Sequence, residues 1–566
     1  MKPSDPSDLI RQAFAFFAAG ASDRAEGLFR GILKDHPGQP DAMHGMACLA
    51  RARGQNATAI ALTGRALQDR TLSADRSGPM HVTLGLALVA EKHVEAGRAA
   101  LSVAVALQPD SPQALAALGE VLWLLGRREE ARQTLEKAVA LSPADVSLQT
   151  RLGELYLEDG LSAAALSHFR AVATRRPHDG AALANLGAVL FELNELTEAR
   201  LILQRACRSG AVTPETLNSL GLVDMAMGHL GAARSALEQA LARRPDDGRL
   251  AGSLGTLLMD MGEEDRAEQV FAAIMSRENG IEAIRARFNR ATVLLGQGRF
   301  AEGWKDFESR RVLLGHRDVA PLWDGSCGSG PVAVTAEQGL GDMLQFLRFL
   351  PEAARRRPLR LRFAAASLTT FMPELTKDRL LPSKGPVDAE ISLLSLPFVL
   401  GMTEAPSTLP YLTVPVCPEP DLVGLAWAGN PSYRFDRRRS LRPEWLAPLL
   451  ETKGVRFLSL QREHALTGME KAPLDTLDDL ARAVARCSLV LSVDTLAAHM
   501  AGAIGRPLWL LNRPGGDWRW KDVPWYENVR QFRPERDGPP EKTWPVTLDR
   551  VAAELRQWVQ SRVEGA

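Results

Sequence analysis

The sequence predicts two architectures in one chain: an N-terminal array of paired helices, followed by an α/β region made of two facing halves. Three observations predict this fold class. A Leu-Gly dipeptide recurs at a period of 34 residues through the first half of the chain. Of the 11 tryptophans, only Trp123 precedes residue 300. From Trp323 onward, short apolar runs alternate with amphipathic helical stretches, which is typical of parallel, doubly wound sheets.

The Leu-Gly pairs mark a helical repeat. They stand at Leu84-Gly85, Leu118-Gly119, Leu152-Gly153, Leu186-Gly187, Leu220-Gly221 and Leu254-Gly255. A small residue follows each Gly after 12 positions, and Leu or Phe follows after 16. Gly in a helix costs about 1 kcal/mol relative to Ala, so a recurring Gly indicates a place where two antiparallel helices touch. The period and pattern resemble the tetratricopeptide repeat (TPR), which predicts a surface for holding another protein.

The array is expected over residues 7–312 as about eight helix pairs. A degenerate first repeat, an irregular join at residues 71–79 and a capping segment at 287–311 complete it. The two α/β halves are expected at 320–415 and 416–566, separated by a proline-rich stretch. The predicted strands are residues 331–336, 359–364, 389–394, 422–427, 455–460, 488–493 and 507–511.

Composition excludes several classes of function. Lys plus Arg equals Asp plus Glu at 68 each, so no overall positive charge favours nucleic acid or an anionic membrane. The five cysteines form no C-x-x-C pair, which argues against a disulfide framework and a structural zinc site. The apolar stretch 13–21 fits the first repeat better than an export signal, and no apolar run is long enough to span a bilayer. We therefore expect a soluble, cytoplasmic protein that binds no metal.

Two segments place polar groups where a strand gives way to a helix. In the first, Glu337–Asp342 (EQGLGD), the glycines permit a tight turn, and Asp342 falls in the first helical turn. In the second, Asp494, Thr495 and His499 converge at the carboxyl end of a predicted strand, where open α/β sheets bind ligands. The structural alternatives are helix N-caps for Asp342 and Asp494 and a core histidine for His499.

Two further segments carry arginines and aromatic rings. Gly429-Asn430-Pro431, followed by the stretch DRRRS, could bind a diphosphate or a phosphomonoester, because guanidinium groups match phosphate oxygens. The alternative is a solvated basic loop. The stretch DWRW, with Trp525-Tyr526 after it, offers aromatic faces that stack on sugars or bases, or that close a core.

In this order, the segments from Trp323 to about Tyr526 resemble the TPR-linked glycosyltransferases related to the bacterial heptosyltransferase family. The matching stretches are AEQGLGDMLQFLRFLP, SLLSLP, GLAWAGNP with DRRRS, LSLQ, SVDTLAAHMAGAIGRPLWLL, DWRW and PWY. The resemblance implies a GT-B architecture of two Rossmann-like halves, a nucleotide-sugar donor in the C-terminal half, and no metal requirement. Two departures from the family, a short segment between Trp520 and Trp525 and a compressed N-terminal half, concern the acceptor side.

The resemblance also implies roles for residues. The catalytic base is expected at Asp342. The predicted donor contacts are Gly429, Asn430, Arg437, Asp494, Thr495 and His499. The predicted acceptor-side loop contacts are Gln338, Gly339, Gly341 and Trp518.

The sequence therefore predicts an inverting, metal-independent protein O-glycosyltransferase that uses a nucleotide sugar as a substrate and needs no cofactor. The repeats would recruit the protein acceptor. The layout resembles the flagellin-modifying transferases, which implies flagellin as acceptor and a CMP-linked, sialic-acid-like nonulosonic acid as donor. Two alternatives stay open: a TPR scaffold with an inactive transferase-like domain, and a heptosyltransferase-like transferase that modifies a glycolipid.

Overall fold

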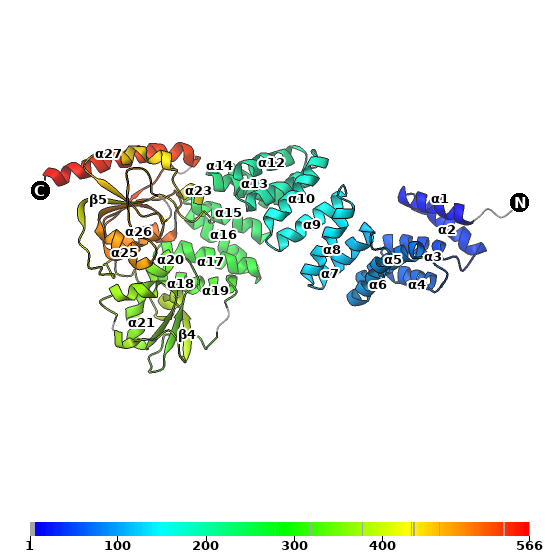
Figure 1. Ribbon diagram of the computed structural model, residues 1–566, viewed down its shortest axis with the longest axis horizontal. Coiled ribbons are helices and arrows are strands. Elements are labelled where there is room, and N and C mark those ends of the chain that lie inside the picture. Colours follow the sequence, from blue (N-terminus) through cyan, green and yellow to red (C-terminus); the bar gives the residue numbers. More distant parts are fainter. Residues whose placement is uncertain are drawn as a thin grey trace. The chain divides into compact units, whose positions relative to one another are not determined.

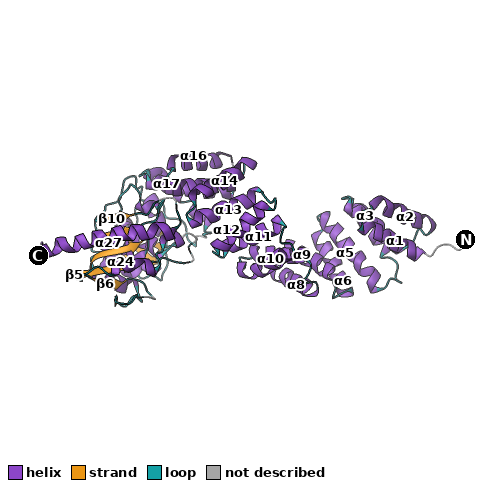
Figure 2. Ribbon diagram, turned by 90° about the horizontal axis from the view of Figure 1, so that it is seen from above, coloured by secondary structure: helices purple, strands orange, loops and turns teal. Residues whose placement is uncertain are grey.

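The computed structural model describes residues 6–277, 279–316, 319–375, 377–431, 433, 436–462, 465–535 and 538–564 (Figure 1). The chain divides into two compact units, Met1–Leu193 and Asn194–Ala566. Helices make up the described part of the first unit, and all strands named below lie in the second (Figure 2).

The first unit consists of antiparallel helix pairs that follow one another along the chain. Its helices are α1 (Pro6–Ala18), α2 (Ser22–Asp35), α3 (Pro40–Ala52), α4 (Asn56–Ala66), α5 (Ala74–Ala90), α6 (Val94–Leu107), α7 (Pro112–Leu124), α8 (Arg128–Leu141), α9 (Val146–Glu158), α10 (Ser162–Arg175) and α11 (Gly180–Glu192). The connection between α4 and α5 is residues 67–73, so the irregular join predicted at 71–79 is only partly correct: α5 begins at Ala74 and contains Pro79.

The repeated glycines lie where the sequence predicted close helix contact. A Cβ atom at Gly119 would lie 2.6 Å from Leu135 Cγ, and one at Gly153 would lie 2.9 Å from Phe169 Cε2. In both repeats the residue 16 positions after the Gly therefore fills the space that a side chain would need. The side chains of Asp145 and Asp179 accept hydrogen bonds from backbone N–H groups in the first turns of α9 and α11. These N-caps stabilise each repeat locally.

The second unit begins with more repeat helices and continues into the α/β region. The repeat helices are α12 (Leu196–Arg208), α13 (Pro214–Met227), α14 (Leu230–Arg243), α15 (Gly248–Met261), α16 (Glu264–Arg277), α17 (Ile281–Gly296), α18 (Phe300–Phe307) and α19 (Arg310–Leu313). As in the first unit, Gly255 packs against Phe271, 16 residues later.

The N-terminal α/β half is built on a parallel sheet of four strands in the order β3-β2-β1-β4. Its elements are β1 (Val332–Thr335), α20 (Leu340–Phe346), η1 (Leu347–Phe349), α21 (Leu350–Arg356), β2 (Leu359–Arg362), η2 (Ala364–Phe371), η3 (Lys377–Arg379), β3 (Leu380–Leu381), β4 (Ala389–Ser392), η4 (Leu393–Ser395) and α22 (Leu396–Val399). The central strand β1 pairs with β2 on one side and β4 on the other, so α20 starts from the middle of this sheet.

The C-terminal half is built on a parallel sheet of six strands in the order β10-β9-β8-β5-β6-β7. Its elements are β5 (Glu419–Ala426), α23 (Asp436–Arg439), η5 (Pro443–Leu446), α24 (Ala447–Leu450), β6 (Arg456–Ser459), β7 (Glu470–Lys471), α25 (Leu477–Arg486), β8 (Cys487–Val493), α26 (Leu496–Ile504), β9 (Leu508–Leu511), η6 (Trp518–Trp520), β10 (Val529–Phe532) and α27 (Pro540–Glu564). Strand residues alternate between two cores: Leu422 and Ala426 join one, whereas Val423 and Leu425 join the other.

The predicted fold class is confirmed: a helical TPR array precedes two parallel sheets, consistent with two Rossmann-like halves. All seven predicted strands are present. The strands that the sequence did not predict, β3, β7 and β10, lie at sheet edges and are short or polar, so they leave no apolar run in the sequence.

The last repeat shares its hydrophobic core with the α/β region. Ala291, Leu295 and Trp304 are buried in the same cluster as Phe346 and Trp525. The Trp304 ring meets the Phe346 ring edge-on at 5.8 Å and the Trp525 ring at 6.3 Å. Within this unit, the last repeat helices and the α/β region thus share one packed core.

Candidate functional site

A cavity of about 750 Å³ lies at the carboxyl ends of β5, β6 and β8. Ala428, Gln461 and Asp494 line it just beyond the three strands, and the start of α26 lines it beside Asp494. Gly339 and Asp342 line it from the N-terminal half. Residues of both α/β halves thus face one space at the sheet edge where such folds bind ligands.

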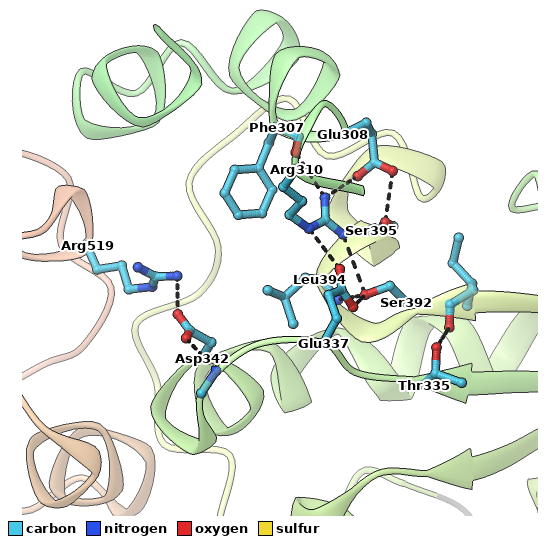
Figure 3. Close-up of polar contacts among 12 residues, drawn as sticks. Phe307, Glu308, Arg310, Thr335, Glu337, Asp342, Ser392, Leu394, Ser395 and Arg519 are labelled. Carbon is cyan, nitrogen blue, oxygen red and sulfur yellow. Dashed lines mark hydrogen bonds and ion pairs between the residues drawn. The ribbon is translucent and has the colours of Figure 1, made fainter. Parts of the chain in front are cut away.

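Asp342 lies at this cavity and also stabilises the start of the helix that carries it. One carboxylate oxygen, Oδ2, accepts a hydrogen bond of 3.1 Å from the backbone N–H of Gly339, the N-cap residue of α20. The other, Oδ1, accepts from Nη2 of Arg519 (Figure 3). The N-cap residue of α20 is Gly339, so Asp342 is not the N-cap; it stabilises the start of the helix from position N3, and the same side chain faces the cavity.

A buried polar network holds the loop that leads to Asp342. Arg310 of the short repeat helix α19 is 1% exposed. Its guanidinium donates to Glu337 at 2.9 Å, to Glu308 at 2.7 Å and to the Ser395 hydroxyl at 2.6 Å (Figure 3). The other Glu337 oxygen accepts from the hydroxyl of Ser392, at the end of β4. Two strands of the sheet and the last repeat thereby fix the start of the Glu337–Asp342 loop.

His499 is buried and neutral. Thr495 is the N-cap residue of α26, and His499 follows one turn later. The His499 Nδ1 atom lies 2.9 Å from the Tyr526 hydroxyl, and the imidazole lies against Trp520 with ring centroids 4.9 Å apart. Burial, followed by the nearby charge of Arg519, lowers the pKa of His499 from 6.5 to about 4. At neutral pH this side chain therefore offers hydrogen bonds to a ligand but no positive charge.

The two cavity aspartates of the C-terminal half titrate differently. Burial, followed by the neighbouring Asp517 carboxylate, raises the pKa of Asp494. Burial opposes ionisation of Asp517 as well, but the Arg519 guanidinium outweighs it and lowers the pKa of Asp517. Asp494 also accepts a hydrogen bond of 2.7 Å from Trp520 Nε1. Asp517 thus ionises first and keeps Arg519 paired, while Asp494 is the member that holds a proton longer.

The loop after β5 brings an arginine to the cavity. The Gly429 backbone N–H donates to the Ser440 hydroxyl at 2.8 Å, which closes the loop. Arg439 crosses over Gly429, and its Nη1 donates to the backbone carbonyl of Asp494 at 2.9 Å. Asp436 accepts from the same guanidinium at 2.7 Å. Arg439 therefore ties the β5 loop to the β8 loop at the cavity wall.

The structure brings eight of the predicted site residues to the cavity: Gly339, Gly341, Asp342, Gly429, Asn430, Asp494, Thr495 and His499. It places three others elsewhere. Arg437 donates to Glu541 of α27 at 2.6 Å, and Gln338 is half-buried in the loop before α20. Trp518 is buried, with its ring 5.9 Å from that of Trp304. None of the three is among the residues that line the cavity.

Four cavity arginines were not predicted as site residues: Arg439, Arg462, Arg513 and Arg519. Three of them are paired with aspartates, namely Arg439 with Asp436, Arg513 with Asp260 and Arg519 with Asp342 and Asp517. The stretches DRRRS and DWRW signalled two of them, but not which arginine turns inward.

Among the described residues, no group of three or more His, Cys, Asp or Glu side chains is placed to hold a metal ion. In the same part of the chain, we find no helix of sufficient length and apolar character to cross a membrane.

Comparison with known families identifies the helical part. Two tetratricopeptide repeat families match, one over residues 224–287 and the other over 82–146 and 150–212. The chain is a TPR protein with a C-terminal parallel α/β region. A distant homologue of this TPR protein is Protein FlbA of Caulobacter vibrioides, which is 26% identical over 465 residues, or 71% of this chain and 76% of FlbA.

Solved structures of TPR proteins are similar to parts of this one. A TPR protein from Parabacteroides merdae is 16% identical and covers 42% of this chain and 93% of its own, with a TM-score of 0.38. A thermophilic TPR protein from Thermus thermophilus is 23% identical and covers 33% of this chain and 99% of its own, with a TM-score of 0.29.

Proposed function

We propose that this TPR protein is a glycosyltransferase that moves a sugar from a nucleoside-phosphate donor to a hydroxyl group of a protein held by the repeats. The observation that carries the proposal is the composition of the cavity. Asp342 faces it from one α/β half, and Arg439, Arg513 and the N-terminus of α26 face it from the other. A carboxylate opposite a set of phosphate-binding groups is the arrangement that glycosyl transfer requires.

In the proposed reaction, the acceptor oxygen bonds to the anomeric carbon while the bond from that carbon to the donor phosphate oxygen breaks. Asp342 takes the proton of the acceptor hydroxyl, and Arg519 orients the Asp342 carboxylate through their ion pair. Arg439 and Arg513, with the N–H groups at the start of α26, stabilise the charge left on the phosphate. Arg439 takes over the phosphate contact that the sequence suggested for Arg437.

One observation favours a second candidate, a TPR scaffold whose transferase-like domain is inactive. Both carboxylate oxygens of Asp342 already accept hydrogen bonds, one from Gly339 and one from Arg519. A carboxylate that only stabilises a helix start and pairs with an arginine would have the same geometry as Asp342 and would need no catalytic role. The two candidates predict different effects on turnover when the charge of the Asp342 carboxylate is removed.

The test replaces Asp342 by Asn, which keeps an oxygen to accept from Gly339 but cannot act as a base. We expect turnover to fall by about 10²–10⁴-fold while donor affinity changes little. The control is Asp179→Asn, because the Asp179 carboxylate caps the N-terminus of repeat helix α11 and does not line the cavity. Equal, small effects of both substitutions on turnover would favour the scaffold.

The assay measures the intact mass of an acceptor protein after incubation with CMP-, UDP-, GDP- and ADP-linked sugars. Flagellin and a CMP-linked, sialic-acid-like nonulosonic acid are the first pair to test, on the strength of the sequence resemblance. A mass increment on the acceptor identifies the sugar class. Absence of any increment across the donors, together with absence of nucleotide binding, would refute the proposed function.

A further inference from the structure

Asp260 of repeat helix α15 lies between two arginines of the C-terminal α/β half. Its Oδ1 atom accepts from Arg513 Nη1 at 2.7 Å, and its Oδ2 atom accepts from Arg438 Nη1. All three side chains are largely buried, and Asp260 is 6% exposed. One carboxylate from the repeats therefore satisfies two guanidinium groups that come from different loops of the α/β half.

Both of these loops supply the cavity. Arg513 itself lines it. Arg438 does not line the cavity, but it belongs to α23, and the last residue of α23 is the cavity arginine Arg439. The Arg513 loop also approaches α15 through its backbone, since a Cβ atom at Gly515 would lie 2.6 Å from the Cα atom of Asp260. Asp260 is thus the point at which a repeat helix meets both arginine-bearing loops.

The repeat fold does not need a buried carboxylate at this position. Asp260 stands five residues after the Gly of its Leu-Gly pair. The residues at the same offset in four earlier repeats are exposed, namely Ala90, Leu124, Glu158 and Glu192, whereas Ala226 of the adjacent repeat is buried and apolar. No other repeat with this Leu-Gly pair has a buried carboxylate at this offset, and in α15 the carboxylate contacts the α/β half. A buried ion pair is also a poor way to gain stability, because apolar residues of similar volume usually serve as well or better.

We propose that Asp260 is a positioning residue of the donor site, which holds Arg513 and the α23 segment so that their guanidinium groups meet the donor's phosphate. This inference rests on the proposed function. The three groups together carry one net positive charge beside the cavity, which suits a nucleoside mono- or diphosphate. A TPR helix thereby forms part of the wall that supports donor binding.

The test compares Asp260→Asn with a buried carboxylate whose ion-pair partners both lie in the repeats. Asp224 of α13 is 2% exposed and pairs with Arg200 and His229, so Asp224→Asn is the matched control. The full-length variants are titrated by calorimetry with CMP, UDP, GDP, ADP and inorganic diphosphate. We expect Asp260→Asn to weaken binding of the tightest probe by about 10- to 100-fold, and Asp224→Asn to change it by less than about twofold.

Steady-state kinetics separates positioning from general destabilisation. We expect Asp260→Asn to raise the KM for the donor by more than it lowers kcat, because the base Asp342 lies on the other α/β half. If Asp260→Asn does not fold, the variant Arg438→Met tests the inference in its place, because it leaves Asp260 paired with Arg513 but removes its ion pair to α23. That variant should also weaken probe binding, although Arg438 does not line the cavity.

The inference is wrong if the variants at 260 and 438 bind the probes as the wild type does, or if Asp224→Asn weakens binding equally. These results would leave the proposed function intact if the wild type still binds a nucleotide and transfers sugar. A wild type that binds none of the probes would instead refute the proposed function and this inference with it.

Discussion

Replacement of Gly429 by Ala should separate donor binding from folding. The backbone at Gly429 is not in the left-handed region, so alanine can adopt it. The new Cβ atom, however, would lie 2.1 Å from Arg439 Nη2 and 2.5 Å from Arg439 Cζ. Non-bonded heavy atoms prefer separations of about 3.5–4.0 Å, so the guanidinium must move by about 1 Å or more.

The size of the effect follows from what Arg439 touches. Its movement disturbs the 2.9 Å bond to the Asp494 carbonyl and the 2.7 Å bond to Asp436, and it withdraws the guanidinium from the cavity. A hydrogen bond to a charged group contributes about 1.5–3 kcal/mol, which corresponds to roughly 10- to 100-fold in donor affinity. Stability should change by only about 1 kcal/mol, because the displaced atoms form the end of a flexible side chain.

The assay is calorimetric titration of Gly429→Ala with the tightest nucleotide, accompanied by thermal unfolding. The control is Gly252→Ala in α15, where a Cβ atom would meet nothing within 4 Å. Donor affinity equal to that of the wild type would refute the role given to Arg439. A drop in affinity that merely accompanies a large loss of melting temperature would refute the reasoning as well.

Two further predictions concern stability. Because the pKa of His499 is about 4 when folded and 6.5 when exposed, the unfolded chain binds the extra proton between these values, so the unfolding free energy falls as pH falls through this window. His499→Phe should remove a pH-dependent contribution of roughly 3 kcal/mol to the unfolding free energy. If the difference in unfolding free energy between this variant and the wild type is the same at pH 7 and at pH 4.5, the prediction is wrong. Gly153→Leu should cost about 1–3 kcal/mol by overpacking against Phe169. Glu154→Leu, whose side chain is 44% exposed, should cost much less, and equal losses of melting temperature would refute the repeat register.

Local patterns sufficed to predict the repeats and the strand ends. The period of 34 residues located the helix contacts, because Gly and its partner residue lie in the same repeat. Asp494 and His499 were predicted to converge because a strand end and one helical turn fix their separation. These features depend on residues close together in the sequence.

The arginines could not be assigned in this way. Arg437, Arg438 and Arg439 are consecutive, yet they donate to Glu541, to Asp260 and to the Asp494 carbonyl, respectively. Each partner lies more than 50 residues away, so only tertiary packing decides which guanidinium reaches the cavity. Trp518 shows the same limit, since an aromatic ring that could stack on a sugar instead fills the core beside Trp304.

The shared core of Trp304, Phe346 and Trp525 limits how such a protein can be recombined. Repeats within residues 1–193 can be gained, lost or exchanged between proteins without opening that core, so the range of captured partners can change by simple duplication. A chimera joined at residue 312 would instead cut through it and expose several large aromatic rings. Fusions that graft a foreign repeat array onto this α/β region should therefore join before Asn194 and keep the native helices that follow.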